Sequence, residues 1–368
     1  MSEVSAAVLA PTVAWAAFAL AFAFGLVAQR SNFCTMGAIS DVVNMGDWTR
    51  MRMWLVAIAV AVLGANGLAL AGLIDLSKSI YTGPTLLWLS SIVGGLCFGF
   101  GMTLASGCGS KTLLRIGSGN LKSVVVLLVM AISAYMTLKG LFGVWRVALL
   151  DPAHLVLAGT QDLPSMLARA AGLDRRATQT GLALLIAIGL IAFALRSREF
   201  RNLDAIASSA FIGLIIVGGW YVSGRIGYLA EDPNTLQEAF AGTNSGRMES
   251  FSFVAPVAYS LELLMLWSDK SRIVTFGIAA TVGVIAGSFA WALASRSFRL
   301  EGFRDAEDTA NHLVGGALMG FGGVTGLGCT IGQGLTGVST LAAGSFITFG
   351  AIVAGSVAAF RYQTWRLG

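Results

Sequence analysis

The sequence predicts an all-α polytopic membrane protein that forms a single membrane domain over residues 1–368. Apolar residues make up 56% of the chain and charged residues only 12%, and the mean hydropathy is +0.76. A soluble domain carries about a quarter charged residues. The 46 glycines are typical of closely packed and interrupted membrane helices. Composition therefore excludes an ordinary soluble domain.

Nine apolar runs are long enough to cross a bilayer, since a spanning helix needs about 20 mostly apolar residues. No basic segment and no small-residue cleavage site accompanies the first run, so we expect a retained helix and not a removed signal. An odd number of crossings places the two termini on opposite sides. The predicted spans are 10–29, 52–75, 85–104, 121–145, 178–196, 205–224, 273–295, 310–327 and 341–360.

Four further segments are apolar but too short or too interrupted to span. Each opens with glycine, proline or small residues, which predicts re-entrant half-helices that are buried in protein or line a cavity. The four segments are Asn32–Met45, Cys108–Gly117, Phe251–Trp267 and Cys329–Gly337.

The lysines and arginines of the loops predict the orientation, because cytoplasmic loops carry an excess of them. The richer face holds loops 1–2, 3–4, 5–6 and 7–8 and the C-terminal tail. We therefore expect the N-terminus outside and the C-terminus in the cytoplasm. The cations of the richer face are Arg30, Arg50, Arg52, Lys111, Arg115, Lys122, Arg196, Arg198, Arg201, Arg296, Arg299, Arg304, Arg361 and Arg366.

Two stretches of equal length match at an offset of 221 residues. GGLCFGFGMTLASGC (Gly94–Cys108) and GGALMGFGGVTGLGC (Gly315–Cys329) both run from a glycine pair through GFG to a cysteine. The match predicts a first repeat over 10–145, a connector with the fifth span over 146–204, and a second repeat over 205–361. The halves should be inverted, because an odd number of crossings separates them, and inverted repeats place a substrate site near the midplane.

The four cysteines do not suggest a disulfide framework or a metal site, because no CxxC motif and no Cys/His cluster occurs. We expect no cofactor. Cys97 lies within a predicted span and is expected to pack as a small hydrophobe. Cys34, Cys108 and Cys329 instead lie at predicted helix breaks, where a role in transport is favoured over packing.

The predicted substrate-binding residues surround the starts of two half-helices. A helix start offers unpaired N–H groups and a favourable dipole to an anion, and flanking glycines let the anion approach the backbone. Lys111 and Arg115 fall on one helical face and serve either as substrate cations or as topology anchors. The predicted set is Cys34, Cys108, Cys329, Gly107, Gly109, Gly328, Lys111, Arg115 and Gln333.

Thiols distinguish the predicted substrate from phosphate or sulfate. A weakly donating S–H group adds little to a phosphate or sulfate site, whereas the terminal sulfur of thiosulfate can accept from S–H groups while its oxygens take N–H groups. A sulfur-bearing anion is therefore favoured. A membrane sulfurtransferase or redox protein with Cys108 as nucleophile is the alternative, and a channel for a neutral solute is a third possibility that has no use for three thiols.

At these residues the sequence resembles the YeeE/YedE family of sulfur transporters. The resemblance rests on SNFCTMG, ASGCGS followed by LLRIGSGN, SFSFVAP and GLGCTIGQGL, and covers nearly the whole chain. It implies a non-enzymatic thiosulfate importer of the cell inner membrane, an hourglass-shaped inverted repeat, and a path past Cys34, Cys108 and Cys329. It further implies membrane lipid and a small cytoplasmic sulfur carrier of the TusA type as partners, and no nucleic acid.

Overall fold

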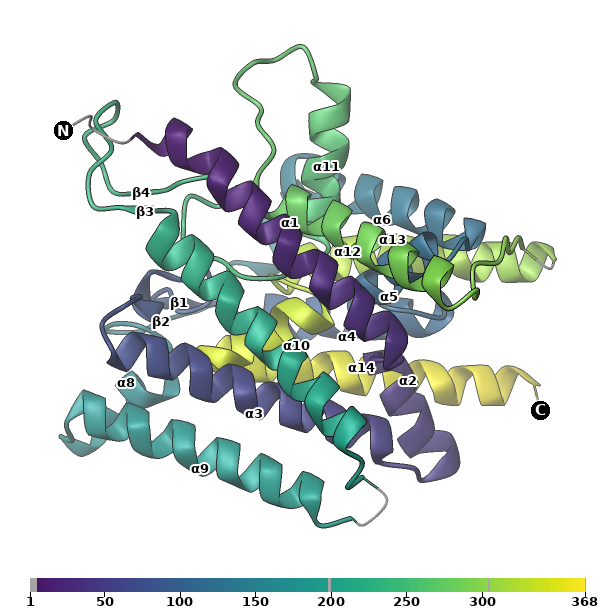
Figure 1. The fold of residues 1–368 in the computed structure, drawn as a ribbon, viewed down its shortest axis with the longest axis horizontal. Helices are drawn as coiled ribbons and strands as arrows, with labels where there is room; N and C mark the ends of the chain where they lie inside the picture. The colour runs from purple at the N-terminus through teal and green to yellow at the C-terminus, as the bar shows by residue number, and fades with distance from the viewer. Residues whose placement is uncertain (1–4, 198–199, 304, 368) are drawn as a thin grey trace.

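A computed structural model describes residues 5–197, 200–303 and 305–367. Arg198 and Arg304, two of the predicted loop cations, lie outside the described residues. The chain is a bundle of long helices joined by short helical turns (Figure 1). The long helices are α1 (Ala6–Arg30), α3 (Thr49–Leu70), α4 (Trp88–Leu104), α6 (Leu121–Lys139), α9 (Arg175–Leu195), α10 (Leu203–Tyr221), α12 (Phe276–Ala294), α13 (Ala306–Thr325) and α14 (Ala343–Leu367).

Shorter elements lie between the long helices. The short helices are α2 (Thr35–Ser40), α5 (Gly109–Gly117), α7 (Leu141–Trp145), α8 (Leu163–Ala171) and α11 (Ala255–Met265), and the π-helical turns are η1 (Asp41–Met45), η3 (Arg146–Leu150), η4 (Val222–Ile226) and η5 (Gly332–Gly337). The element η2 (Leu76–Lys78) is a 3₁₀ turn. Strand β1 (Thr85–Leu86) pairs with β2 (Leu155–Val156), and β3 (Tyr228–Leu229) with β4 (Ala239–Phe240), both antiparallel.

A long helix stands at the position of each predicted span, and the fold class is confirmed as an all-α polytopic membrane protein. Eight helical segments of the described chain are long and apolar enough to cross a membrane. Helix α13 is long enough but carries Glu307, Asp308 and His312 in its first two turns. The count of nine crossings therefore stays a prediction.

The predicted fourth span, 121–145, differs from the structure at its end. Helix α6 ends at Lys139 because Gly140 adopts an extended backbone, and α7 and η3 follow as a separate turn. The predicted half-helix Phe251–Trp267 is likewise shorter, since α11 begins only at Ala255, next to Pro256. Proline is well tolerated in the first turn of a helix, which explains this start.

Glycines bring α4 and α13 into close contact. A Cβ on Gly101 would lie 2.7 Å from the carbonyl oxygen of Gly315, and a Cβ on Gly315 would lie 2.6 Å from that of Gly101. Gly94 and Gly322 meet in the same reciprocal way. Because the early residues of one helix contact the late residues of the other, α4 and α13 run antiparallel. The GG and GFG motifs are thus the packing surface of this crossing.

The other helix contacts come in matching pairs. Helix α1 packs on α12 as α10 packs on α3, α4 packs on α14 as α13 packs on α6, and α5 contacts α12 as η5 contacts α3. The two contacts of each pair correspond when one series of elements is taken as equivalent to the other. The first series is α1, α2, α3, α4, α5 and α6, and the second is, in the same order, α10, α11, α12, α13, η5 and α14. Helix α9 has no counterpart in this exchange and lies outside α3 (Figure 1).

The bundle has two ends, which we name by their elements. The strand face carries β1 to β4 and the chain's N-terminal end, and the η1 face carries η1 and the C-terminal end (Figure 1). Helix α11 projects from the side of the bundle and is tied to α6 by the ion pair between Lys139 and Glu262, at 2.7 Å. The thiols lie between the two faces.

Candidate functional site

The same turn precedes each of Cys34, Cys108 and Cys329. A helix ends, a residue other than glycine adopts positive φ two positions before the cysteine, and the next helical segment starts directly after it. The positive-φ residues are Asn32 (φ 51°), Ser106 (φ 56°) and Leu327 (φ 57°). Non-glycine residues seldom adopt this conformation, so its occurrence before all three cysteines marks a common local structure, which we call the thiol turn.

One hydrogen bond closes each thiol turn. The N–H of the residue before the cysteine donates to the carbonyl five residues earlier, the pattern of a Schellman helix end. The three bonds join Phe33 to Ala28 at 3.1 Å, Gly107 to Met102 at 2.8 Å, and Gly328 to Gly323 at 2.7 Å. The helix ends are thereby satisfied internally, as buried backbone must be in a membrane.

The thiol sulfurs accept hydrogen bonds and keep their protons available. Cys34 Sγ accepts from the N–H of Gly37, and Cys329 Sγ accepts from the N–H of Gly332, each at 3.4 Å. Cys108 Sγ lies 3.3 Å from Ser110 Oγ. A thiol is both a weak donor and a weak acceptor, so a sulfur that accepts from the backbone can still offer its S–H proton to an acceptor.

The structure brings the three predicted cysteines together in a row. Cys108 lies close enough to interact electrostatically with both Cys34 and Cys329. Cys108 and Cys329 are fully buried and Cys34 is 6% exposed. An anion can therefore reach these thiols only when the surrounding side chains move.

The predicted cations lie at the end of the row nearest the η1 face. Lys111 interacts electrostatically with Cys34, Cys108, Arg115 and Arg50. Arg50 is itself paired with Asp41, through Nε and through a second contact at 2.7 Å. Within the described part of the chain, neither Lys111 nor Arg115 forms an ion pair with a carboxylate. Their charge is thus uncompensated beside Cys34 and Cys108.

The predicted glycines have different surroundings. A Cβ on Gly107 would lie 3.2 Å from the side chain of Lys111, and one on Gly109 would lie 3.3 Å from the carbonyl oxygen of Phe253. A Cβ on Gly328 would lie 3.2 Å from the Gln333 side chain. The Gln333 amide donates to the carbonyl of Gly326 at the end of α13. Gln333 therefore supports a helix end in this structure.

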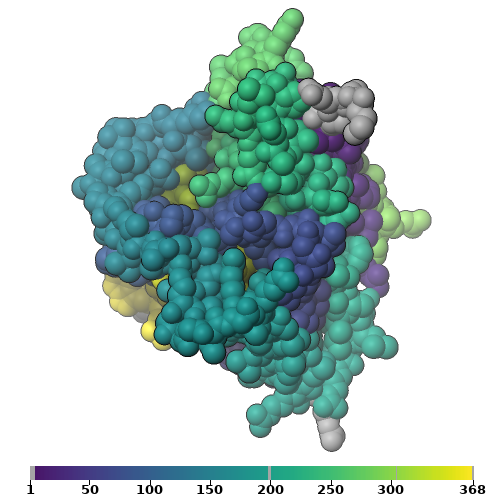
Figure 2. All heavy atoms as spheres, turned by 90° about the vertical axis from the view of Figure 1, so that its left-hand side faces the viewer, coloured from purple at the N-terminus to yellow at the C-terminus, as the bar shows by residue number. Residues whose placement is uncertain are grey.

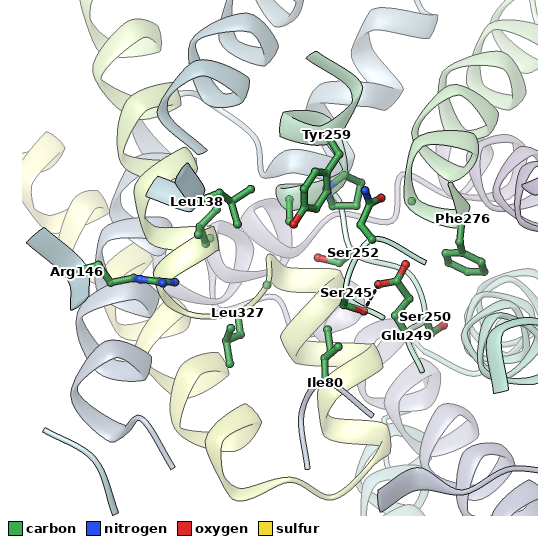
Figure 3. Close-up of a pocket in the computed structure, with 17 residues that line it drawn as sticks. Ile80, Leu138, Arg146, Ser245, Glu249, Ser250, Ser252, Tyr259, Phe276 and Leu327 are labelled. Carbon is green, nitrogen blue, oxygen red and sulfur yellow. Dashed lines mark hydrogen bonds between the residues drawn. The ribbon is translucent and has the colours of Figure 1, made fainter. Parts of the chain in front are cut away.

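A cavity of about 190 Å³ approaches Cys329 from the other end of the row. It reaches Leu327 and Gly328, within the thiol turn of Cys329, and Arg146 and Glu249 line opposite sides of it (Figure 3). On the strand face, Figure 2 shows yellow C-terminal atoms at the bottom of a recess between blue and green segments. We call the 190 Å³ cavity lined by Arg146, Glu249 and Gly328 the strand-face cavity.

Glu249 is the carboxylate of the strand-face cavity. Its Oε2 accepts from Ser245 Oγ at 2.9 Å (Figure 3). Burial in this mostly apolar cavity raises the pKa of Glu249 to about 7, because a low-dielectric site disfavours the charged form. The carboxyl thus changes charge in the neutral pH range, inside the cavity that approaches Cys329.

Several polar residues of the sequence prove to be separate from the row of thiols. Cys97 lies within α4 and is partly exposed on the bundle. Glu262 pairs with Lys139 and, at 3.3 Å, with Arg272. His312 Nδ1 lies 3.1 Å from Asp308 Oδ1 at the start of α13. Glu262 and His312 are thus paired with local partners.

Sequence reasoning missed the positive-φ residues and Tyr81. Asn32 has the residue type that favours positive φ, and its place two residues before a cysteine could have drawn attention. Ser106 and Leu327 carry no such signal. Tyr81 comes from the loop before β1, and only the fold brings it to Cys329.

Comparison with known proteins identifies related transporters. A family described as "Sulphur transport" matches residues 30–358. The thiosulfate transporter TsuA of Escherichia coli is 28% identical over 334 residues, covering 84% of this chain and 83% of that protein. TsuA of Spirochaeta thermophila is 26% identical over 342 residues, covering 90% and 94%. The probable transporter YedE of E. coli matches at 29% over 96 residues, which are 26% of this chain and 22% of that protein.

These relatives are described as transporters and not as enzymes. This agrees with the expected non-enzymatic function. The family match covers both Gly-rich stretches and all three thiol turns. The chain therefore belongs to the sulphur transport family and is a multi-pass membrane protein of that family.

Proposed function

We propose that the protein imports thiosulfate across the cell inner membrane, and the observation that carries this proposal is the row of three thiol turns. The row runs from the strand-face cavity at Gly328, through Cys329, Cys108 and Cys34, to the uncompensated cations Lys111 and Arg115. The thiosulfate transporters that match most of the chain support this choice of anion.

Thiosulfate moves along the row by hydrogen bonds and without a covalent step. The sulfurs of Cys34 and Cys329 accept from backbone N–H groups, so each proton is offered to the terminal sulfur of the anion. In the contact of Cys108 with Ser110 either group can donate, so the Cys108 proton can also turn to the anion. Such S–H···S contacts are weak, which suits a path that must admit the ion and also release it. The anion contacts Cys329 first, then Cys108 and finally Cys34. Because they carry no side chain, Gly107, Gly109 and Gly328 let the oxygens of the anion approach backbone N–H groups.

The two halves of the bundle act as an inverted repeat, 10–145 and 205–361, around the connector 146–204. The antiparallel crossing of α4 on α13 and the matched helix contacts support this division. We place the strand face outside and the η1 face in the cytoplasm, because Lys111, Arg115 and Arg50 belong to the richer set of loop cations. A basic cytoplasmic face also suits an acidic sulfur carrier of the TusA type.

The membrane potential limits passive uptake of a dianion. Each negative charge moved inward against 100 mV costs about 2.3 kcal/mol, so thiosulfate needs roughly twice that. Uptake is therefore driven by a co-transported ion or by rapid consumption of thiosulfate inside the cell. Glu249, whose carboxyl changes charge near pH 7 at the entrance, is the residue best placed to respond to protons.

The test is uptake of radiolabelled thiosulfate in cells without other thiosulfate importers. Wild type should accumulate label, and Cys34→Ala, Cys108→Ala and Cys329→Ala should each abolish accumulation at matched expression. Cys97→Ala is the control, since this thiol lies outside the row. Absence of uptake by wild type would refute the proposal.

A second measurement separates transport from the sulfurtransferase alternative. A thiol nucleophile would carry a persulfide during turnover, which mass spectrometry of the isolated protein detects after brief exposure to thiosulfate. The hydrogen-bond path predicts an unmodified Cys108. A persulfide on Cys108 that forms at the rate of uptake would favour the enzyme.

A further inference from the structure

Tyr81 is buried with its hydroxyl group unpaired. The residue is 3% exposed, and Tyr81 Oη has no hydrogen-bond partner among the described residues. A buried hydroxyl without a partner is unfavourable, and buried polar groups are nearly always satisfied. The neighbouring Trp220 donates its Nε1–H to Ser339 Oγ, whereas Tyr81 Oη is left without a protein partner and can therefore bind a ligand.

The hydroxyl of Tyr81 faces the first turn of the segment that begins at Cys329. A Cβ built on Gly332 would lie 3.4 Å from Tyr81 Oη and 2.6 Å from Ser252 Oγ. The N–H of the same Gly332 donates to Cys329 Sγ. Two side-chain hydroxyls and one thiol therefore lie against a single glycine.

This group of hydroxyls is continuous with the strand-face cavity. Ser252 lines the cavity together with Gly328, as Figure 3 shows for Ser252. Tyr81 follows the lining residue Ile80 in the chain and is close enough to interact electrostatically with both Cys329 and Glu249. An anion in the cavity thus has Ser252 beside it, and Tyr81 lies against the glycine that donates to the Cys329 sulfur.

The ring of Tyr81 is held in a fixed position. It packs edge-on against Trp220, with ring centroids 6.3 Å apart and an interplanar angle of 83°. Its backbone N–H donates to Ser79 Oγ at 3.3 Å. Burial raises the pKa of Tyr81 well above its ordinary value, which keeps the hydroxyl protonated and able to donate. A rigid donor loses little entropy when it binds an anion.

We propose that Tyr81 is a substrate-binding residue that donates a hydrogen bond from Oη to a sulfonate oxygen of the anion while the Cys329 thiol contacts its terminal sulfur. Ser252 donates to a second oxygen as the anion leaves the cavity. This inference rests on the proposed thiosulfate transport and adds the element that recognises the oxygen end of the ion. The thiol and the hydroxyls together recognise both the terminal sulfur and the oxygens of the anion.

The test is Tyr81→Phe, which removes one oxygen atom and keeps the ring. We expect the KM of thiosulfate uptake to rise about tenfold or more, since a hydrogen bond to a charged group contributes at least a factor of ten. The thermal unfolding midpoint should stay unchanged or rise, because no protein partner loses a bond. Tyr221→Phe is the matched control, since this ring is 39% exposed on α10.

Two results would overturn the role of Tyr81 while leaving the transport proposal intact: a KM within twofold of wild type, or a lowered unfolding midpoint that shows the hydroxyl to be structural. Calorimetric titration of the purified protein with thiosulfate separates the two proposals further. Wild type that binds thiosulfate more tightly than Tyr81→Phe but does not take it up would refute transport alone. Wild type that neither binds nor takes up thiosulfate would refute both.

Discussion

Replacing Gly322 by alanine tests whether the glycine crossing of α4 and α13 holds the thiol turns in place. A Cβ at this position would lie 2.5 Å from both the Gly94 carbonyl oxygen and the Phe98 nitrogen. Ordinary contact begins at 3.4 Å, and both obstacles are backbone atoms that no rotamer change can move. The two helices must therefore separate by about 0.9 Å at their crossing.

The energetic outcome is the balance of two effects. Overpacking of this kind typically costs about 1–3 kcal/mol, while alanine gains about 0.8–1 kcal/mol over glycine in helix propensity. We expect a net loss of about 0–2 kcal/mol. Because α4 and α13 lead directly into the thiol turns of Cys108 and Cys329, the separation also displaces the contact between these turns, and uptake should fall by more than the loss of stability explains.

The assay combines unfolding of the purified protein in mild detergent with thiosulfate uptake at matched expression. Gly350→Ala is the control, since Gly350 lies within α14 with open space around its Cα. The control should leave uptake unchanged and stability unchanged or slightly raised. If Gly322→Ala behaves like Gly350→Ala in both measurements, the close crossing does not position the thiols.

Three further substitutions probe charge. Glu249→Gln should remove the pH dependence of uptake: in wild type the carboxyl is neutral below about pH 7 and repels the anion above it, so uptake should fall between external pH 6 and 8, whereas the variant keeps its rate. Glu262→Gln should lower stability by about 1.5–3 kcal/mol without changing KM, as thermal unfolding and uptake will show, because Lys139 and Arg272 lose their shared carboxylate. Lys111→Gln should slow uptake while leaving the unfolding midpoint unchanged or higher, since it removes an uncompensated cation beside the thiols.

Much of the fold could be predicted from sequence because membrane helices leave a strong signal. Each predicted span coincides with a long helix, and α5 begins directly after Cys108 as expected. The high glycine content predicted closely packed helices, and the contact of Gly101 with Gly315 is one such contact, although only the structure shows which glycines meet. Helix α6 ended early at Gly140, since the apolar run continues through a glycine that breaks the helix.

The candidate site was less predictable, because its main features depend on contacts between distant segments. The cysteines could be selected by their position at helix breaks, but the positive φ of Ser106 and Leu327 has no counterpart in residue type. Tyr81 lies 248 positions before Cys329 in the chain, and no periodicity links the two. The pKa of Glu249 likewise follows from a cavity formed by several elements. Local signals thus predicted where the thiols lie, and tertiary packing decided what surrounds them.

The most direct measurement is influx of radiolabelled thiosulfate into liposomes that contain only the purified protein. Reconstitution removes cellular consumption of the anion and any carrier protein, so the rate reports the path itself. We expect saturable influx for wild type and for Cys97→Ala, and no influx above protein-free liposomes for Cys108→Ala, because Cys108 is the middle thiol of the row. Influx through Cys108→Ala at the wild-type rate would contradict the thiol path.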